Sequence, residues 1–136
     1  MTQEEKDLLL KDLCARLPHG VNMATGYGRG LLTSIRINDS NEKLGINIDP
    51  TLIRMFSVND VKPYLFPISS MTEEQKVEFD KAAELDIEYT ITQIKNDARN
   101  WTSGLNRFNW LLKNHFDVYD LIPMGLANDA TGLNIY

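Results

Sequence analysis

The sequence predicts an α+β fold, a single domain over residues 1–136 in which helices pack on an antiparallel sheet. Apolar residues recur at helical spacing before residue 18 and again after residue 72, whereas the stretch between them is rich in β-branched residues and turn formers. A length of 136 residues suits one domain. A sheet with one apolar face needs a covering layer. We therefore expect three or four strands over about 20–58, covered by a helix over about 3–17, a long or kinked helix over about 72–100, and a third helix over about 103–115.

The first helix has a recognisable start and stop. Thr2 and Glu5 form a capping box, in which each side chain accepts a hydrogen bond from the other residue's backbone amide. Pro18 ends the helix near Leu17, since the residue before a proline avoids the α region. We expect Cys14 to be buried as a small hydrophobic side chain. It belongs to an apolar face that consists of Leu9, Leu10, Leu13, Cys14 and Leu17.

The strand region divides into runs separated by turn residues. Alternating or β-branched runs cover residues 20–25, 31–37, 44–48 and 52–58. The Gly26-x-Gly28-x-Gly30 sequence has the spacing of a phosphate-binding loop, but such a loop requires a helix directly after its glycines. A β-branched run follows here, which favours a hairpin turn.

Two prolines, Pro63 and Pro67, bracket an apolar segment after the strand region. Because proline cannot donate to a sheet ladder, this segment is predicted to be an extended, rigid connector and not a central strand. On an exposed connector, Tyr64 and Phe66 become candidate anchors for a protein partner, since aromatic residues dominate interface hot spots. Packing in the core is the alternative interpretation of both.

The second half of the sequence is predicted to be mainly helical. Thr72 and Gln75 form another capping box, and the apolar stripe after it shifts near Asp86, which indicates a kink or a break. Ser103 can cap the third helix. The apolar segment 121–127 contains a proline and a glycine, which favours a short turn docked on the core.

Composition excludes several classes of protein. Cys14 is the only cysteine, so an internal disulfide and a zinc site built on several cysteines are both excluded. The first residues lack a basic region followed by an apolar run, and apolar runs reach only three residues, as in Leu8–Leu10, where a membrane helix needs roughly 20. We expect a cytoplasmic protein that does not enter the membrane, and no motif indicates a cofactor.

The net charge of −5 is unevenly distributed. Residues 72–99 contain eight acids and four bases, whereas residues 19–63 contain four acids and five bases. A nucleic-acid-binding protein normally has a basic patch that neutralises phosphates, and no basic cluster is visible in the sequence. Nucleic-acid binding would require the five bases of the strand region to gather on one sheet face: Arg29, Arg36, Lys43, Arg54 and Lys62.

Two groups of residues suggest acid–base chemistry, but each has a simpler interpretation. Glu84, Asp86 and Glu88 could pair in a cleft or hold a divalent metal ion, although residues two apart on a helix point in different directions. His115 and Asp117 could form an oriented imidazole, but no motif ties a nucleophile to them. A solvated surface and a histidine at a helix C-terminus are the commoner explanations. We assign no catalytic, cofactor-binding or metal-binding residue.

Three stretches carry a resemblance to a known family. They are residues 4–18, residues 62–74 around Lys62-Pro63-Tyr64-Leu65 and Ser69-Ser70-Met71-Thr72, and residues 110–127 from Trp110-Leu111-Leu112 to Pro123-Met124-Gly125. They resemble a family of small proteins encoded by phages and prophages of gut Bacteroidales, to which no activity is assigned. The resemblance implies a mobile-element origin and the cytoplasm of a bacterial host.

Three functions remain open. The first is a non-catalytic accessory protein that binds a host or phage protein, as the small size and the absence of a catalytic motif indicate. The second is a nucleic-acid-associated protein, and the third is a small enzyme with a carboxylate or His–Asp site. The sequence leaves the oligomeric state open, because the predicted long helix can pack within one chain or against a second copy.

Overall fold

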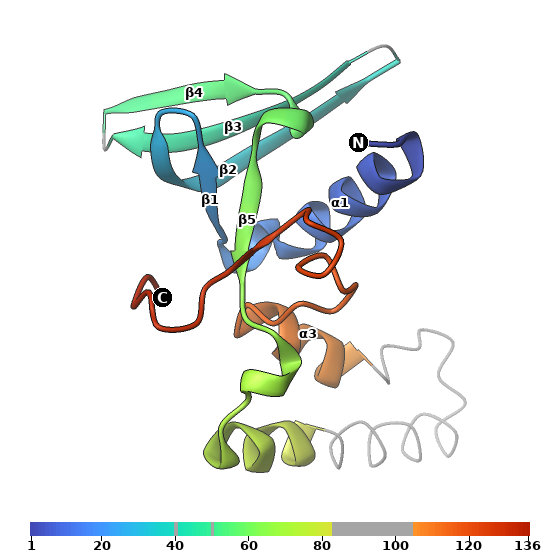
Figure 1. Ribbon diagram of the computed structural model, residues 1–136, viewed down its shortest axis with the longest axis vertical. Coiled ribbons are helices and arrows are strands. Elements are labelled where there is room, and N and C mark those ends of the chain that lie inside the picture. The colour runs from blue at the N-terminus through green and yellow to red at the C-terminus, as the bar shows by residue number, and fades with distance from the viewer. Residues whose placement is uncertain (40, 50, 83–104) are drawn as a thin grey trace, which may run out of the picture.

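Six described strands form one mixed sheet in the order β4-β3-β2-β1-β5-β6 (Figure 1). The structure is a computed structural model that describes residues 1–39, 41–49, 51–82 and 105–136. The strands are β1 (Asn22–Thr25), β2 (Gly28–Asn38), β3 (Asn41–Asp49), β4 (Leu52–Phe56), β5 (Lys62–Leu65) and β6 (Asn128–Asp129). The predicted α+β class is confirmed.

The first four strands form an antiparallel meander joined by short turns, over the part of the chain where three or four strands were predicted. The predicted hairpin is present, but its turn is shorter than the predicted Gly26–Gly30: it consists of Gly26 and Tyr27, and Gly28 already pairs with Thr25 as the first residue of β2. Gly28 has a positive φ of 118°, a conformation that glycine adopts without steric cost. β5 then pairs antiparallel with β1, and β6 pairs parallel with β5.

The segment predicted as a connector is the strand β5, so that prediction was wrong. Pro63 lies opposite Met23 of β1, while β6 pairs only with Tyr64 and Leu65. At Pro63 the strand therefore has a partner on one side only. A proline without an N–H fits such a local edge position.

The predicted first helix is present as α1 (Gln3–Arg16), followed by the 3₁₀ turn η1 (Leu17–His19). Both hydrogen bonds of its capping box form, from the Glu5 amide to Thr2 at 3.1 Å and from the Thr2 amide to Glu5 at 2.9 Å. Leu9 and Leu13 are fully buried in the core cluster with the inner side of the sheet. A salt bridge of 3.0 Å between Lys6 and Glu42 ties the helix to β3.

Cys14 is exposed, which corrects the prediction that it is buried. The buried positions of α1 include Leu9, Asp12, Leu13 and Arg16, spaced as i, i+3, i+4 and i+7. Two charged residues therefore occupy the buried stripe. The prediction failed because it placed the stripe by apolar character alone.

The sheet curls over its inner side. Tyr27, at the tip of the β1–β2 hairpin, lies with its ring centroid 6.0 Å from that of Phe56 and 4.5 Å from the guanidinium carbon of Arg54 on β4. The hairpin and β3 approach so closely that a Cβ at Gly30 would lie 2.7 Å from the Asn47 carbonyl oxygen. The curl encloses the core between α1, the strands and the 3₁₀ turn η2 (Val58–Asp60).

The remaining elements lie below this sheet in Figure 1. The 3₁₀ turn η3 (Ile68–Ser70) leads to a helical stretch over residues 73–82, and the predicted capping box at Thr72 and Gln75 is present. α3 spans Leu105–Lys113, within the range predicted for the third helix. The predicted kink near Asp86 and the cap at Ser103 lie outside the described residues.

The segment 121–127 docks on the core through turns, as predicted. Leu121, Leu126 and Ala127 are buried in the core cluster. β6 follows directly and was not predicted, because two residues are too few to show a strand pattern. None of the described helices combines the length and apolarity needed to cross a membrane.

Candidate binding surface

The antiparallel strands present an outer face that points away from the core. Residues opposite each other in an antiparallel ladder point to the same side of the sheet. Leu44 is fully buried, and both Ile35 of β2 and Phe56 of β4 lie directly opposite it in the ladders. These three residues define the inner face. Neighbouring residues along each strand therefore point outward.

Four rows of the outer face cross the sheet, and a further neutral pair, Asn38 and Asn41, follows the fourth row at the β2–β3 turn. The first row is Arg29, Ala24 and Lys62, and the second is Asn22, Leu31, Asn47 and Ile53. The third is Ser34, Gly45 and Met55, and the fourth is Arg36 and Lys43. Among these four rows the first and the last are basic, and exposed apolar side chains lie between them.

A β-bulge puts the two basic rows on the same face. The ladder between β2 and β3 shifts between Leu32 and Ser34, which leaves Thr33 as the extra residue. Arg29 and Arg36 are seven positions apart, so in a regular strand they would point to opposite faces. The Thr33 hydroxyl donates a 3.0 Å hydrogen bond to the Gly45 carbonyl oxygen and fixes the irregularity.

The apolar side chains of this face are unusually open to solvent. Leu31 is 44% exposed, Ile53 is 55% exposed and Met55 is 48% exposed. Ile53 and Met55 belong to β4, which is the last strand of the sheet on that side. Ile53 and Met55 are neighbours on this face of β4, and exposed apolar side chains that are rimmed by polar ones are typical of interaction sites.

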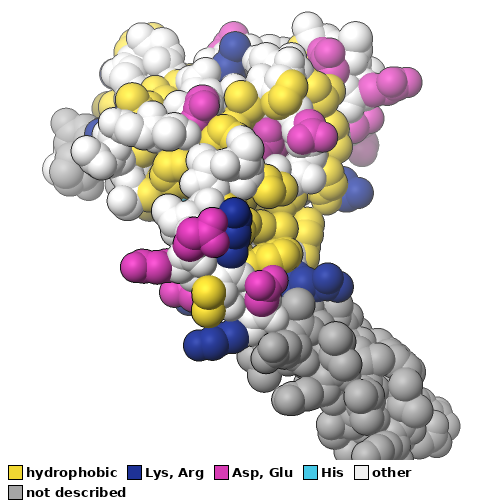
Figure 2. Space-filling view, turned by 60° about the horizontal axis from the view of Figure 1, so that its bottom comes forward, with side chains coloured by type: hydrophobic (Ala, Val, Ile, Leu, Met, Phe, Trp, Pro, Cys, Tyr) yellow, Lys and Arg dark blue, Asp and Glu magenta, His cyan; other side chains and the backbone are white. Residues whose placement is uncertain are grey.

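The four bases are exposed, and none forms an ion pair with a described residue. The outward positions in the four rows include no carboxylate. The surface below the sheet in Figure 1 differs. Figure 2, in which that end of the molecule comes forward, shows Asp and Glu side chains there together with Lys and Arg. We call the four rows the outer sheet face.

Arg54 is the one base of the predicted five that lies on the inner side, opposite Ile46. Its guanidinium covers the Tyr27 ring, where it helps to hold the hairpin tip. The other four bases of the nucleic-acid hypothesis share the outer sheet face.

Tyr64 and Phe66, the predicted partner anchors, are both half-buried. The Tyr64 carbonyl accepts a 2.8 Å hydrogen bond from the Tyr136 hydroxyl, and the Phe66 ring packs against Phe116 and Tyr136. The backbone of Phe66 also pairs with Phe116 and Asp117. The observed contacts of both residues join the last part of the chain to the sheet.

A charged cluster is buried between α1 and the chain after α3. Arg16 and Asp12 are both fully buried, and they form a bidentate ion pair with distances of 2.7 and 3.0 Å. Arg16 also donates to the Phe116 carbonyl, while its Nη1 has no partner among the described residues. Burial raises the pKa of the Asp12 carboxyl, and the hydrogen bond from Arg16 opposes part of that rise.

His115 lies just after the C-terminus of α3, as the preferred interpretation of the sequence expected, and its observed partner is Tyr136 and not Asp117. His115 adopts a positive φ of 64°, and its ring stacks on that of Tyr136 with centroids 3.5 Å apart. Burial and the positive charge of Arg16 lower the pKa of His115 to about 4. Burial likewise raises the pKa of the Tyr136 hydroxyl to about 12. A neutral, stacked imidazole is a structural group here and not a poised base.

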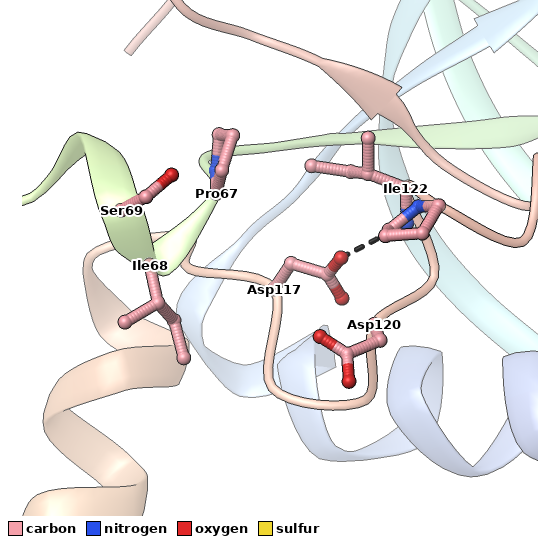
Figure 3. Close-up of a pocket in the computed structure, with 7 residues that line it drawn as sticks. Pro67, Ile68, Ser69, Asp117, Asp120 and Ile122 are labelled. Carbon is pink, nitrogen blue, oxygen red and sulfur yellow. Dashed lines mark hydrogen bonds between the residues drawn. The ribbon is translucent and has the colours of Figure 1, made fainter.

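Asp117 organises a turn. Its two carboxylate oxygens each accept a 2.9 Å hydrogen bond, from the amides of Leu121 and Ile122. The carboxylate borders a recess of about 290 Å³ that Asp120 and η3 also line (Figure 3). Since both Asp117 oxygens already hold the backbone, the recess offers no paired acid and base.

Glu84, Asp86 and Glu88 lie outside the described residues. Among the residues that the structure describes, no three His, Cys, Asp or Glu side chains are grouped to hold a metal ion. The sequence named the five bases as a possible group but could not place four of them on one face, because the bulge that brings them together has no signature in residue types.

Comparisons with known proteins give no match. No protein-family model matches the chain. No curated protein and no solved structure matches it either.

Proposed function

We propose that this protein is a non-catalytic module that binds another protein through its outer sheet face. The observation that carries the proposal is the exposure of Leu31, Ile53 and Met55 on one face between two basic rows. Burying about 100 Å² of apolar surface contributes about 2.5 kcal/mol to association, and these side chains lie ready for such burial. About half of each side chain stays open to solvent in the folded protein, and this half is the part that a partner would cover.

The buried charges support a structural scaffold and not an active site. Arg16 donates hydrogen bonds to Asp12 and to a backbone carbonyl. Asp117 accepts hydrogen bonds from backbone amides. An enzyme needs titratable groups that meet in an accessible pocket. The described residues offer an interaction surface more clearly than they offer such a pocket.

The test is capture of partners by the tagged protein under matched conditions. A variant with Ile53→Ser and Met55→Ser removes apolar character from the outer sheet face. A control variant with Val77→Ser and Leu133→Ser removes exposed apolar side chains elsewhere, at positions 54% and 49% exposed. A protein retained by the wild type and the control but lost by the outer-face variant supports the proposal. Equal retention by all three proteins contradicts it.

Nucleic-acid binding is the second candidate, and it rests on Arg29, Arg36, Lys43 and Lys62 sharing one face. Binding would fall steeply with salt, since each neutralised phosphate releases counterions. Titration of labelled single- and double-stranded DNA and RNA with the protein at low salt tests this candidate function. A fluorescence signal that does not change with protein concentration contradicts nucleic-acid binding.

The cellular setting is part of the same proposal. The resemblance to phage and prophage proteins of gut Bacteroidales supports a bacterial cytoplasm, so lysate of such a host is the first source of partners. Fractionating host cells that express the tagged protein measures its location, and recovery outside the cytoplasmic fraction contradicts this setting.

A further inference from the structure

We propose that the outer sheet face takes an extended acidic peptide segment, with carboxylates at both ends and apolar side chains between them. This inference rests on the proposed function and names the chemistry of the partner. Its basis is charge complementarity. A chain of net charge −5 gathers four bases on one face, where the strand rows have no carboxylate.

The fourth row contains two like charges that face each other and no carboxylate. Arg36 and Lys43 lie directly opposite each other on β2 and β3, both exposed. Like charges in such a position destabilise a sheet. Neither base forms an ion pair with a described residue, so a carboxylate from a partner would relieve a repulsion that the fold itself leaves uncompensated.

The first row offers a second anchor. Arg29 and Lys62 flank Ala24 on the two strands beside β1, and each lies directly opposite it in its ladder. With strands about 4.8 Å apart, two bases roughly 10 Å apart can share one or two carboxylates. The small Ala24 side chain between them leaves room for a ligand.

The distance between the anchors sets the length of the ligand. Arg29 and Arg36 are seven positions apart on β2, and because Thr33 is the extra residue of the bulge, six ladder steps separate them, about 20 Å at 3.3 Å per residue. An extended segment covers this distance with about six or seven residues. Its middle part would pass Leu31, Ile53 and Met55, the exposed apolar side chains of the two central rows.

The apolar part of the face favours a peptide over a nucleic acid. Proteins that bind single strands stack bases on aromatic rings between the basic side chains. The central rows here have aliphatic and thioether side chains, with Leu31, Ile53 and Met55. Such side chains pack against Leu, Ile or Val of a peptide.

A short synthetic peptide tests this chemistry on the full chain. The probe is a fluorescein-labelled, terminally blocked peptide with the sequence Asp-Glu-Ser-Leu-Ser-Ile-Ser-Glu-Asp, which presents Glu, Leu, Ile and Glu on one side when extended. The control is Leu-Ser-Glu-Asp-Ser-Asp-Glu-Ser-Ile, with the same composition and net charge. Fluorescence anisotropy is measured at low and at high salt, with unlabelled oligo(dT) as a competitor.

Matched variants locate the binding. Arg36→Gln with Lys43→Gln removes the fourth row, whereas Lys113→Gln removes one exposed base at the end of α3. We expect tighter binding of the probe than of the control peptide, and at least tenfold weaker binding to the double variant. Lys113→Gln should change the affinity by less than twofold, and circular dichroism should show all variants folded.

The outcomes separate this inference from the proposed function. No binding of the probe, equal binding of both peptides, or an unchanged affinity of the double variant overturns the inference. Displacement of the probe by oligo(dT) at lower concentration than by unlabelled probe also overturns it and favours a nucleic acid. If the peptide fails while Ile53→Ser with Met55→Ser still loses a captured protein, the proposed function stands and only the partner chemistry is wrong. If both experiments fail, both proposals fall.

Discussion

Two buried residues of opposite charge, Asp12 and Arg16, share the inner stripe of α1 with the leucines that were expected there. Removing one member of a buried pair leaves an uncompensated charge, which typically costs about 3–5 kcal/mol. We predict that Asp12→Ala lowers the free energy of unfolding by roughly that amount, measured by urea denaturation. Asp12→Leu combined with Arg16→Met should recover much of the loss. A double variant that loses the sum of the two single effects would show that the charges do not act as a pair.

His115 gives the stability a defined pH dependence. Its folded pKa of about 4 lies below the ordinary value of 6.5, so the unfolded chain binds a proton more readily between these values. The folded state therefore loses stability as the pH falls through this range, by about 1 kcal/mol between pH 7.5 and 5.5. We predict that His115→Asn removes the part of this pH-dependent loss of stability that His115 causes, because asparagine tolerates the positive φ and does not titrate. Urea unfolding of both proteins at the two pH values measures the difference, and equal slopes would contradict it. Asp12 acts in the opposite direction, since burial raises its pKa above 3.8 and the folded state therefore binds that proton more readily than the unfolded chain does.

Gly30 is required by a close backbone approach. A Cβ at this position would lie 2.7 Å from the Asn47 carbonyl oxygen, in a ladder that cannot shift without breaking hydrogen bonds. We predict that Gly30→Ala destabilises the protein by about 2–3 kcal/mol, as overpacking does in general. Gly26→Ala is the matched control, because nothing lies within 4 Å of its Cβ. Thermal unfolding compares the two, and similar melting temperatures would contradict the prediction.

At the scale of elements, the last residue of the sequence links two strands. The Tyr136 hydroxyl accepts a 2.9 Å hydrogen bond from the Asn22 amide of β1 and donates to the Tyr64 carbonyl of β5. We predict that Tyr136→Phe costs about 1–2 kcal/mol, since two backbone groups lose their partner. Amide hydrogen exchange should quicken at Asn22 relative to Met23. Unchanged exchange at Asn22 would mean that the hydroxyl does not hold this amide.

The sequence predicts elements well where local chemistry decides them. The capping boxes at Thr2 and Thr72 and the turn glycine at Gly28 each act within a few residues, and the structure has all three. The sequence does not predict an element whose conformation depends on pairing with a segment far away in the chain. β5 is a strand because β1 lies beside it, although Pro63 argued for a connector.

The candidate surface was only partly predictable for a similar reason. The bases were recognised as a possible group, but the side of the sheet on which each lies depends on the bulge at Leu32–Ser34. A regular strand would separate Arg29 from Arg36. Neither Thr33 nor its neighbours differ in type from ordinary strand residues, so the irregularity appears only in the structure.

At the scale of the whole molecule, substitutions on the outer sheet face should affect the stability of the fold and the affinity for a ligand in opposite directions. If the face serves a ligand, a variant can improve the fold while losing the ligand. Lys43→Glu places opposite charges across the β2–β3 ladder at Arg36. We predict that it raises the free energy of unfolding by about 0.5 kcal/mol and weakens binding of the acidic peptide at least tenfold. Paired urea unfolding and anisotropy measurements check both parts, and a loss of stability would contradict the like-charge argument.

The long-range contacts of this fold impose an order on its formation. The β1–β4 meander closes through short turns, so it can form while the rest of the chain is still being synthesised. The Arg16 contact with Phe116 spans 100 residues and the Asn22 contact with Tyr136 spans 114. Closing such large loops carries an entropic cost that only complete packing offsets. On the ribosome, Arg16 of α1 therefore cannot reach the Phe116 carbonyl, and Asn22 of β1 cannot reach Tyr136, until residues 116–136 have been synthesised and released from the exit tunnel.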